Sequence, residues 1–309
     1  MAANNPYNLV TVLGHTAGGK TRFAACLAEK LRGEVISADS RQVYRHMDLG
    51  TGKDYQDYMV NGHQVRCHLI DIVDPGYEYN VYEYQKDFIR VFNAIEKQGF
   101  LPVLCGGSGL YIEAVLKGYR LIRVPLNKEL RTKLAQENID ELTTRLSGFR
   151  KLHNKTDIVD RKRLIRALEI EIYYQEHPEL DEQMPVIRPI VLGIKFDRLS
   201  RRKRISERLE ERFDQGMVEE VQSLLDRGVT AEKLIYYGLE YKYITEYLSG
   251  LTTYKEMFAR LETAIHRFAK RQMTWFRRME REGIKIHWFD GYQPLGDKIE
   301  RAVKLCRTG

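Results

Sequence analysis

The clearest chemical signal in the sequence is a phosphate-binding loop of the form G-x-x-x-x-G-K-[ST], spelled Gly14-His15-Thr16-Ala17-Gly18-Gly19-Lys20-Thr21. Glycines in such a loop let backbone N–H groups turn toward phosphate oxygens, and the following helix adds the positive end of its dipole. We expect Lys20 to place a charge on the terminal phosphate and the Thr21 hydroxyl to ligate Mg²⁺. The sequence therefore predicts a site for a phosphorylated substrate.

Polar residues also follow two other candidate strands. Asp39 and Ser40 close the apolar stretch 33–40, and Ser108 follows the apolar stretch 100–105 within a run of glycines. In an open parallel sheet, ligands bind outside the carboxyl ends of the strands, so these side chains are expected to face the phosphate-binding loop.

Asp71 lies near the end of a further candidate strand, 65–72. Its carboxylate fits two interpretations. It holds magnesium through water, or it caps the turn Asp74-Pro75-Gly76. The sequence leaves both open.

The elements that must position these residues alternate between strands and helices. Apolar runs predict strands at 8–13, 33–40, 65–72, 100–105, 189–194 and 284–289, and helical spacing predicts helices at 21–31, 82–98, 127–149, from 160, 200–212 and 260–281. This order predicts a three-layer α/β core with a mainly parallel sheet. We assign 1–120 and 157–309 to the core and 121–156 to a small inserted helical domain, because strand signals are missing from that segment.

Composition narrows the class of protein. The chain has 309 residues, 43% of them hydrophobic and 30% charged, and a formal net charge of +7, which favours an anionic partner. Its four cysteines are scattered, which argues against a disulfide framework or structural zinc. No apolar run reaches the length of a membrane span, and residues 1–8 lack a signal-peptide pattern. We expect a cytoplasmic monomer.

Two predicted helices carry basic stripes. The residues are Arg201, Arg204, Arg208 and Arg212 in the first, and His266, Arg267, Lys270, Arg271, Arg277 and Arg278 in the second. A charge run is usually a solvated face, but here aromatic residues are interleaved with the second stripe in a net-basic chain. The pattern favours a surface for a nucleic-acid backbone.

With these residues in view, the chain resembles the tRNA dimethylallyltransferase family, which has a P-loop nucleotide-kinase-like core. The matching blocks are, in chain order, Gly14–Thr21, Ile36–Tyr44, Met47–Lys53, His68–Ile72, Gly106–Tyr111, Arg163–Glu169 and Ala269–Phe276. They extend over nearly the whole chain. The Asp-Ser-Arg-Gln-Val-Tyr and Ala-Lys-Arg-Gln blocks are more specific than the phosphate-binding loop.

The resemblance implies transfer of a dimethylallyl group from dimethylallyl diphosphate to the exocyclic N6 amine of the adenosine 3′ to the anticodon, position 37 of tRNA. Lys20, Asp39 and Ser108 would be catalytic, with Asp39 as the general base and Ser108 bound to the diphosphate or the bridging oxygen. Mg²⁺, held partly by Thr21, would neutralise the leaving diphosphate. The adenosine would leave its stack to reach the site.

Two residue sets follow from the resemblance. The diphosphate set is Gly14, Thr16, Ala17, Gly18, Gly19, Lys20, Thr21 and Arg208. The tRNA set, for an anticodon stem-loop, is Asp39, Ser40, Arg41, Gln42, Lys162, Arg163, Arg166, Tyr241, Lys242, Lys270 and Arg271.

Three positions depart from the family pattern. His15 stands where the family usually has proline, and Ser108 stands where it has threonine. Ser108 keeps the hydroxyl, so its expected role survives. Glu240 replaces a glycine and puts an acid where the family allows close approach of RNA.

Three other functions remain open. A nucleoside or nucleotide kinase shares the loop and sheet but uses ATP as donor and needs no arginine-rich helices. An adenylate isopentenyltransferase performs the same transfer on free AMP, and the blocks at Arg163–Arg166 and Lys270–Arg271 argue against it. A non-enzymatic RNA-binding protein would use the loop only as an anion site, and it would not need Asp39 and Ser108 at adjacent strand ends.

Overall fold

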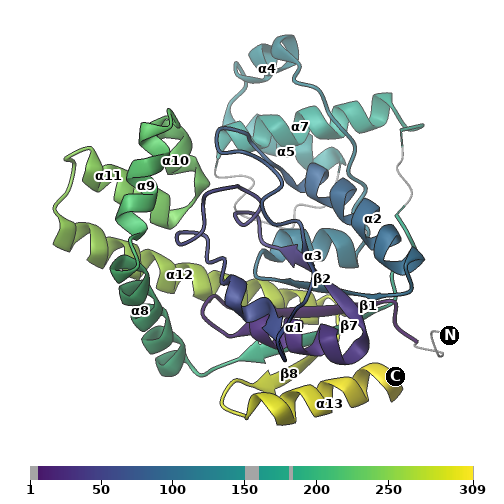
Figure 1. The fold of residues 1–309 in the computed structure, drawn as a ribbon. Helices are drawn as coiled ribbons and strands as arrows, with labels where there is room; N and C mark the ends of the chain where they lie inside the picture. Colours follow the sequence, from purple (N-terminus) through teal and green to yellow (C-terminus); the bar gives the residue numbers. More distant parts are fainter. Residues whose placement is uncertain (1–5, 150–159, 181–183, 309) are drawn as a thin grey trace. The chain divides into compact units, whose positions relative to one another are not determined.

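The computed structural model describes residues 6–149, 160–180 and 184–308. Contacts between residues divide the chain into two compact units (Figure 1). The first unit comprises Met1–Tyr119 and Pro185–Gly309, and the second comprises Arg120–Met184.

The first unit is built on a sheet of six strands in the order β5-β2-β6-β1-β7-β8, all of them parallel. The strands are β1 (Leu9–Gly14), β2 (Gly33–Ala38), β5 (Cys67–His68), β6 (Leu101–Gly106), β7 (Pro189–Lys195) and β8 (Ile286–Asp290). β1 lies inside the sheet, where Leu13 pairs with Gly106 of β6 and with Gly193 of β7. The predicted mainly parallel sheet is confirmed.

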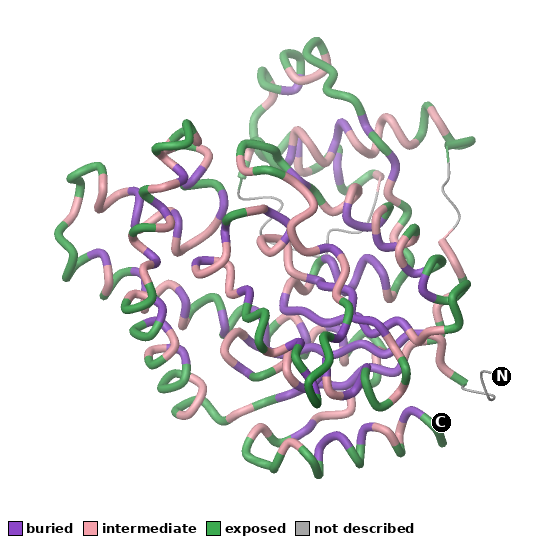
Figure 2. The backbone as a smooth tube through the Cα atoms, in the orientation of Figure 1, coloured by how far each residue is buried: buried purple, intermediate pink, exposed green. Residues whose placement is uncertain are grey.

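Helices cover both faces of this sheet, which confirms the three-layer prediction. Leu9 and Leu13 belong to the core shared with α2, α3 and α12, whereas Val10 and Val12 belong to the core shared with α1 and α13. This alternation follows from the two-residue period of a strand. Figure 2 shows the strands as the most continuously buried part of the unit. The helices named here are α1 (Lys20–Leu31), α2 (Val81–Lys97), α3 (Gly109–Leu116), α12 (Tyr254–Arg281) and α13 (Leu295–Thr308).

Other helices form one side of the same unit. They are α8 (Arg198–Asp214), α9 (Met217–Asp226), α10 (Ala231–Tyr237) and α11 (Leu239–Leu248). A short 3₁₀ helix, η1 (Tyr55–Tyr58), precedes the antiparallel hairpin of β3 (Met59–Val60) and β4 (His63–Gln64). Among the described residues, no helix combines the length and apolar character needed to cross a membrane.

Two predicted elements differ from the structure. The strand predicted at 65–72 is reduced to Cys67–His68, because Leu69 and Asp71 adopt positive φ angles of 61° and 55°, which interrupt an extended backbone. The helix predicted at 127–149 is two helices, α4 (Lys128–Leu134) and α5 (Ile139–Phe149).

In the described part of the second unit, α4, α5 and α7 (Arg161–Glu176) pack around five buried leucines. Glu169 of α7 is also buried, and its carboxylate accepts hydrogen bonds from Arg131 at 2.7 Å and from the backbone N–H of Asn127 at 2.7 Å. Burial alone would raise the pKa of Glu169, but the hydrogen bonds from Arg131 and Arg166 lower it. Because α7 packs with these helices, the unit extends beyond the predicted insertion 121–156, of which 150–156 lie outside the described residues.

Candidate functional site

The phosphate-binding loop joins β1 to α1, as the motif predicts. Gly14 has a φ of 157°, and a Cβ atom there would lie 2.7 Å from the carbonyl oxygen of Ile194 on the neighbouring β7. Gly19 adopts a left-handed φ of 72° directly before α1 and carries no side chain over the helix N-terminus. The first turn of α1 contains no acidic residue. The loop therefore presents the positive end of a helix dipole to an anion.

The Lys20 ammonium group folds back over this loop and donates a hydrogen bond to the backbone carbonyl of His15 at 2.7 Å. Burial lowers the pKa of Lys20, and the positive charge of Arg208 acts in the same direction, whereas Asp39 opposes it. Lys20 therefore lies in the electrostatic field of both Asp39 and Arg208.

His15 is a buried part of the loop framework. Its side chain is fully buried, and Nδ1 lies 2.7 Å from the carbonyl oxygen of Thr16. Burial lowers the pKa of His15 to about 4, and the charges of Lys20, Arg201 and Arg204 add to this effect. The imidazole is therefore neutral near pH 7, with Nδ1–H as the donor to the Thr16 carbonyl.

Gln272 of α12 connects the loop to the end of β6. Its Oε1 accepts a hydrogen bond from the backbone N–H of Thr16 at 2.9 Å, and its Nε2 donates to the carbonyl of Gly107 at 3.0 Å. A Cβ atom at position 107 would lie 2.4 Å from Nε2, so a larger residue there would displace the Gln272 amide from these bonds. Gln272 lies in the Ala269–Phe276 block that resembles the family, but no role was predicted for it. The available signal was a polar residue on the otherwise apolar buried face of α12, beside Ala269, Met273 and Phe276.

Asp39, Ser40 and Ser108 meet at the carboxyl ends of β2 and β6, as predicted. The Ser108 Oγ accepts a hydrogen bond from the backbone N–H of Ser40 at 3.0 Å, and the Asp39 Oδ1 accepts one from the backbone N–H of Arg41 at 2.9 Å. Ser108 is the residue that precedes α3, but its hydroxyl binds Ser40 rather than capping the helix. The Ser108 hydroxyl is therefore fixed to the backbone of Ser40, the residue that follows Asp39.

A small cavity of about 60 Å³ lies beside the loop. It is lined by Thr16, Ala17, Gly50, Thr51, Gly52, Ile205, Arg208, Leu209, Arg212, Glu240 and Ile265. Arg208 donates to Asp54 at 2.6 Å, and Arg212 donates to the same carboxylate at 2.9 Å. Burial raises the pKa of Glu240 to about 6. The predicted diphosphate contact Arg208 thus lines a cavity with the loop, but its charge is shared with Asp54.

Glu220 of α9 fixes the backbone on the other side of this cavity. Its carboxylate accepts hydrogen bonds from the backbone N–H groups of Asp48 at 2.8 Å, Leu49 at 2.7 Å and Gly50 at 3.0 Å. No sequence prediction included Glu220.

Tyr241 is a correction to the predicted tRNA set. Its side chain is only 1% exposed, and its hydroxyl donates to Glu220 at 2.7 Å. A Cβ atom on Gly50 would lie 2.6 Å from the Tyr241 ring, so the ring packs directly under that backbone. Tyr241 therefore supports the loop from the core, whereas the following Lys242 is partly exposed and pairs with Glu246 at 3.9 Å.

Other predicted residues have internal partners. Gln42 accepts a hydrogen bond from the Ser37 hydroxyl at 3.0 Å and donates to the Gly52 carbonyl at 3.0 Å, so it positions the loop after β2. The Asp71 carboxylate accepts from Lys53 at 2.5 Å and from the hydroxyl of Tyr55. Because Lys53 and Tyr55 already bind this carboxylate, the structure argues against both predicted roles of Asp71, as a metal ligand and as a turn cap.

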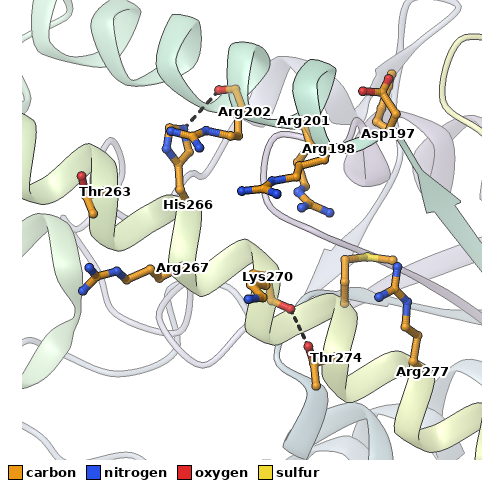
Figure 3. A pocket seen from close by; sticks show the side chains of 12 residues that line it. Asp197, Arg198, Arg201, Arg202, Thr263, His266, Arg267, Lys270, Thr274 and Arg277 are labelled. Atoms are coloured by element: carbon orange, nitrogen blue, oxygen red, sulfur yellow. Dashed lines mark hydrogen bonds between the residues drawn. The ribbon is translucent and has the colours of Figure 1, made fainter.

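A larger cavity of about 580 Å³ lies between α8 and α12. Figure 3 shows Arg198 and Arg201 extending from one helix and Lys270 and Arg277 from the other around the same hollow. Burial lowers the pKa of Arg201, and the charges of Arg277 and Arg198 lower it further. Seven basic side chains line the cavity: Arg198, Arg201, Arg202, His266, Arg267, Lys270 and Arg277. This concentration of positive charge is suited to phosphate groups.

The remaining predicted cations are not among the residues that line this cavity. Arg271 is exposed on α12, with its guanidinium carbon 5.8 Å from the centre of the Phe268 ring. Lys162 and Arg163 are exposed on α7 of the second unit, where Arg166 binds Glu169 and the Val124 carbonyl.

The predicted magnesium ligand Thr21 is the second residue of α1 and is partly exposed. No cluster of three or more histidine, cysteine or acidic side chains within the described ranges is arranged to hold a metal ion. A hydroxyl at the start of this helix is a suitable oxygen donor for Mg²⁺ whose other ligands are diphosphate oxygens and water.

Comparison with known proteins gives consistent matches. Residues 42–279 match the family model described as IPP transferase. A tRNA dimethylallyltransferase 2 of Bacteroides fragilis is 58% identical over 95% of this chain and 96% of its own length, and one of Phocaeicola vulgatus is 56% identical over 98% of both. The crystal structure of a tRNA isopentenylpyrophosphate transferase from Bacillus halodurans superposes with a TM-score of 0.71, at 31% identity over 97% of this chain and 95% of that one. A eukaryotic dimethylallyltransferase acting on tRNA has a TM-score of 0.74 at 21% identity, over 96% of this chain and 77% of that one, which supports the fold alone.

The bridge through Gln272 predicts how Gln272→Ala behaves. The substitution leaves the N–H of Thr16 and the carbonyl of Gly107 without their partner, so the free energy of unfolding should fall by about 1–3 kcal/mol. Inorganic diphosphate should bind more weakly, because the loop is no longer held. Denaturant titration and calorimetry measure the two effects. Gln222→Ala, at an exposed position of α9, is the control; an equal loss in both variants would contradict the role of Gln272.

The buried imidazole of His15 predicts a pH dependence of stability. Its folded pKa of about 4 lies below the value of 6.5 for a free histidine, so the unfolded chain takes up a proton first as the pH falls. The resulting loss of stability should begin near pH 6.5 and reach about 3 kcal/mol near pH 4. The free energy of unfolding of His15→Gln, measured by denaturant titration, should fall less than that of the wild type as the pH is lowered across this range. His63→Gln, at an exposed histidine, should keep the wild-type pH dependence.

Proposed function

Because the chain belongs to the IPP transferase family, we propose that it transfers a dimethylallyl group from dimethylallyl diphosphate to the N6 amine of an adenosine in tRNA, with release of diphosphate. The observation that carries the proposal is the meeting of the phosphate-binding loop with Asp39 and Ser108 at one edge of the sheet. The diphosphate donor would bind after β1 and β6, and the proton acceptor Asp39 follows β2, the next strand of the sheet. The proposed target is the adenosine 3′ to the anticodon, position 37.

The diphosphate is proposed to lie in the loop, bound by backbone N–H groups and by Lys20. Lys20, which donates to the His15 carbonyl, would turn its ammonium group toward a phosphate oxygen. Arg208, which lines the cavity beside Thr16 and Ala17, would add a second cation while remaining paired with Asp54. These fixed charges stabilise the negative charge that grows on the departing diphosphate.

The Asp39 carboxylate is the proposed proton acceptor. As N6 of adenine bonds to the allylic carbon, the bond from that carbon to the diphosphate oxygen breaks and the amine must release a proton. The backbone N–H of Arg41 holds one Asp39 oxygen at 2.9 Å, which orients the carboxylate and leaves its other oxygen for the amine. Ser108 is proposed to donate its hydroxyl hydrogen to the diphosphate.

Mg²⁺ is the proposed cofactor. Thr21 would hold it together with diphosphate oxygens, and it would neutralise the leaving group's charge. The oxygen-donor chemistry of Thr21 fits this ion.

The basic cavity between α8 and α12 is the proposed surface for the tRNA backbone. Its cations come from both helices, and Lys270 belongs to both the cavity and the Ala269–Phe276 block. Lys162, Arg163 and Arg166 of the second unit remain further proposed tRNA contacts. A cytoplasmic monomer that binds an anticodon stem-loop is part of the same proposal.

The direct test is incubation of the protein with dimethylallyl diphosphate, Mg²⁺ and total tRNA, followed by nucleoside mass spectrometry. The expected product is N6-dimethylallyladenosine within tRNA. Parallel reactions contain AMP in place of tRNA, or ATP with nucleosides. Modification of AMP as fast as tRNA would support the free-nucleotide enzyme, and phosphate transfer from ATP would support a kinase.

Asp39→Asn tests the proton acceptor. The amide keeps an oxygen for the N–H of Arg41 but is a far weaker base, so single-turnover transfer should slow by about a hundred- to ten-thousand-fold. The tRNA dissociation constant should stay within about threefold. Asp226→Asn, at an exposed position of α9, is the matched control. A rate for Asp39→Asn within a few-fold of the control would assign Asp39 another role.

The double substitution Lys270→Ala with Arg271→Ala tests the RNA surface. Each lost phosphate contact removes one released counterion, so the log–log slope of binding against salt should become shallower by about one to two. Both side chains are exposed, so the free energy of unfolding should change by less than about 0.5 kcal/mol per substitution. Filter binding at several salt concentrations measures the slope. Lys304→Ala with Arg307→Ala on α13 is the control, and an equal change there would place the RNA elsewhere.

A further inference from the structure

The junction between α10 and α11 presents an exposed aromatic ring. Tyr236 is 47% exposed, whereas the adjacent Tyr237 is fully buried. The Tyr237 hydroxyl accepts a hydrogen bond from the N–H of Gly76 at 2.5 Å and donates to the carbonyl of Tyr77 at 3.0 Å. Tyr237 thus anchors the end of α10 to the core, and it leaves Tyr236 outside.

The Arg41 guanidinium lies against this exposed ring. Its carbon is 5.3 Å from the centre of the Tyr236 ring. Within the described ranges, Arg41 forms no ion pair with a carboxylate. A Cβ atom on Gly238, whose φ is 144°, would lie 3.9 Å from the Arg41 Nε, so the guanidinium also borders the helix junction. Two flat groups therefore lie together at the surface.

Both groups are linked to the reaction site. The backbone N–H of Arg41 donates to Asp39, so the same residue touches the proposed proton acceptor and the exposed ring. Tyr111 gives a second link. Burial raises the pKa of its hydroxyl, which also lies in the electrostatic field of Asp39, Arg41 and Tyr236. Tyr111 itself stacks on Tyr84, with ring centres 4.1 Å apart.

We propose that Tyr236 and Arg41 form a stacking platform for an unpaired RNA base next to the target adenosine. The inference rests on the proposed function. Aromatic rings and guanidinium planes both stack on bases, and recognition of unpaired RNA depends on such contacts. A target base that leaves its stack also exposes the face of its neighbour. The platform covers that face, while the adenosine reaches Asp39. Free AMP has no neighbouring base and gains nothing from the platform.

The test uses an anticodon stem-loop with 2-aminopurine on one side of the target adenosine, in two versions, 5′ and 3′. Stacking on Tyr236 should quench 2-aminopurine fluorescence in one version when the wild-type protein binds. Tyr236→Phe should keep the quenching, and Tyr236→Leu should lose it. Tyr254→Leu is the matched control, because Tyr254 is also 47% exposed but stands at the start of α12. The Tyr254→Leu variant should quench the 2-aminopurine fluorescence as much as the wild type does.

Kinetics separate stacking from support of the catalytic carboxylate. Tyr236→Leu should raise the KM for the stem-loop by about 5- to 150-fold, the range measured for loss of one stacked base. The kcat should change much less. Arg41→Lys keeps the positive charge and the backbone N–H that binds Asp39 but loses the planar group. It should raise KM in the same direction, by a smaller factor.

Several outcomes would overturn the platform. One is equal quenching by Tyr236→Leu and wild type in both labelled versions. Another is a fall in kcat with unchanged KM for Tyr236→Leu, which would make the ring a support for Asp39. A third is an equal rise in KM for Tyr254→Leu. Failure of the proposed function gives a different result, since the wild-type protein would then leave tRNA unmodified in the presence of dimethylallyl diphosphate and Mg²⁺.

Discussion

The geometry of the whole site depends on one buried amide, that of Gln272. A glutamine side chain carries a donor and an acceptor on one rigid group, so it satisfies the Thr16 N–H and the Gly107 carbonyl together. Both partners are backbone groups. α12 therefore holds the phosphate-binding loop after β1 and the glycine run after β6 at a fixed separation. Lys20 and Ser108 extend from these two segments, and this pair of hydrogen bonds adds to the pairing of β1 with β6 in setting their relative positions.

Sequence reasoning predicted the parts of the site that follow from strand order. Asp39 and Ser108 were expected near the phosphate-binding loop because parallel strands end at one edge of a sheet, and the bond from Ser40 to Ser108 confirms that β2 and β6 end together. Gly14 and Gly19 were expected to let backbone N–H groups turn toward phosphate oxygens, and the close approach of the Ile194 carbonyl gives a further reason for glycine at position 14. Short-range rules suffice where the motif, the strand and the helix are adjacent in the chain.

The remaining parts depend on contacts between distant segments. Tyr241 shares one face of α11 with Ile244 and Leu248, so helical spacing was an available signal for its burial, but its place under Gly50 follows from the packing of α11 on α9. The strand expected at 65–72 had the required apolar residues, yet Leu69 and Asp71 take left-handed conformations. Asp71 then forms its ion pair with Lys53. Here tertiary hydrogen bonds and ion pairs outweigh strand propensity.

The three hydrogen bonds from Asp48, Leu49 and Gly50 to Glu220 have a consequence for the timing of order in the site. Successive backbone N–H groups that converge on one point form a nest for an anion, and here the protein's own carboxylate fills it. The conformational entropy of this segment is therefore lost when the chain folds, before any substrate arrives. The substrate then binds against a wall of the small cavity that is already ordered. None of the binding free energy is lost to ordering that wall.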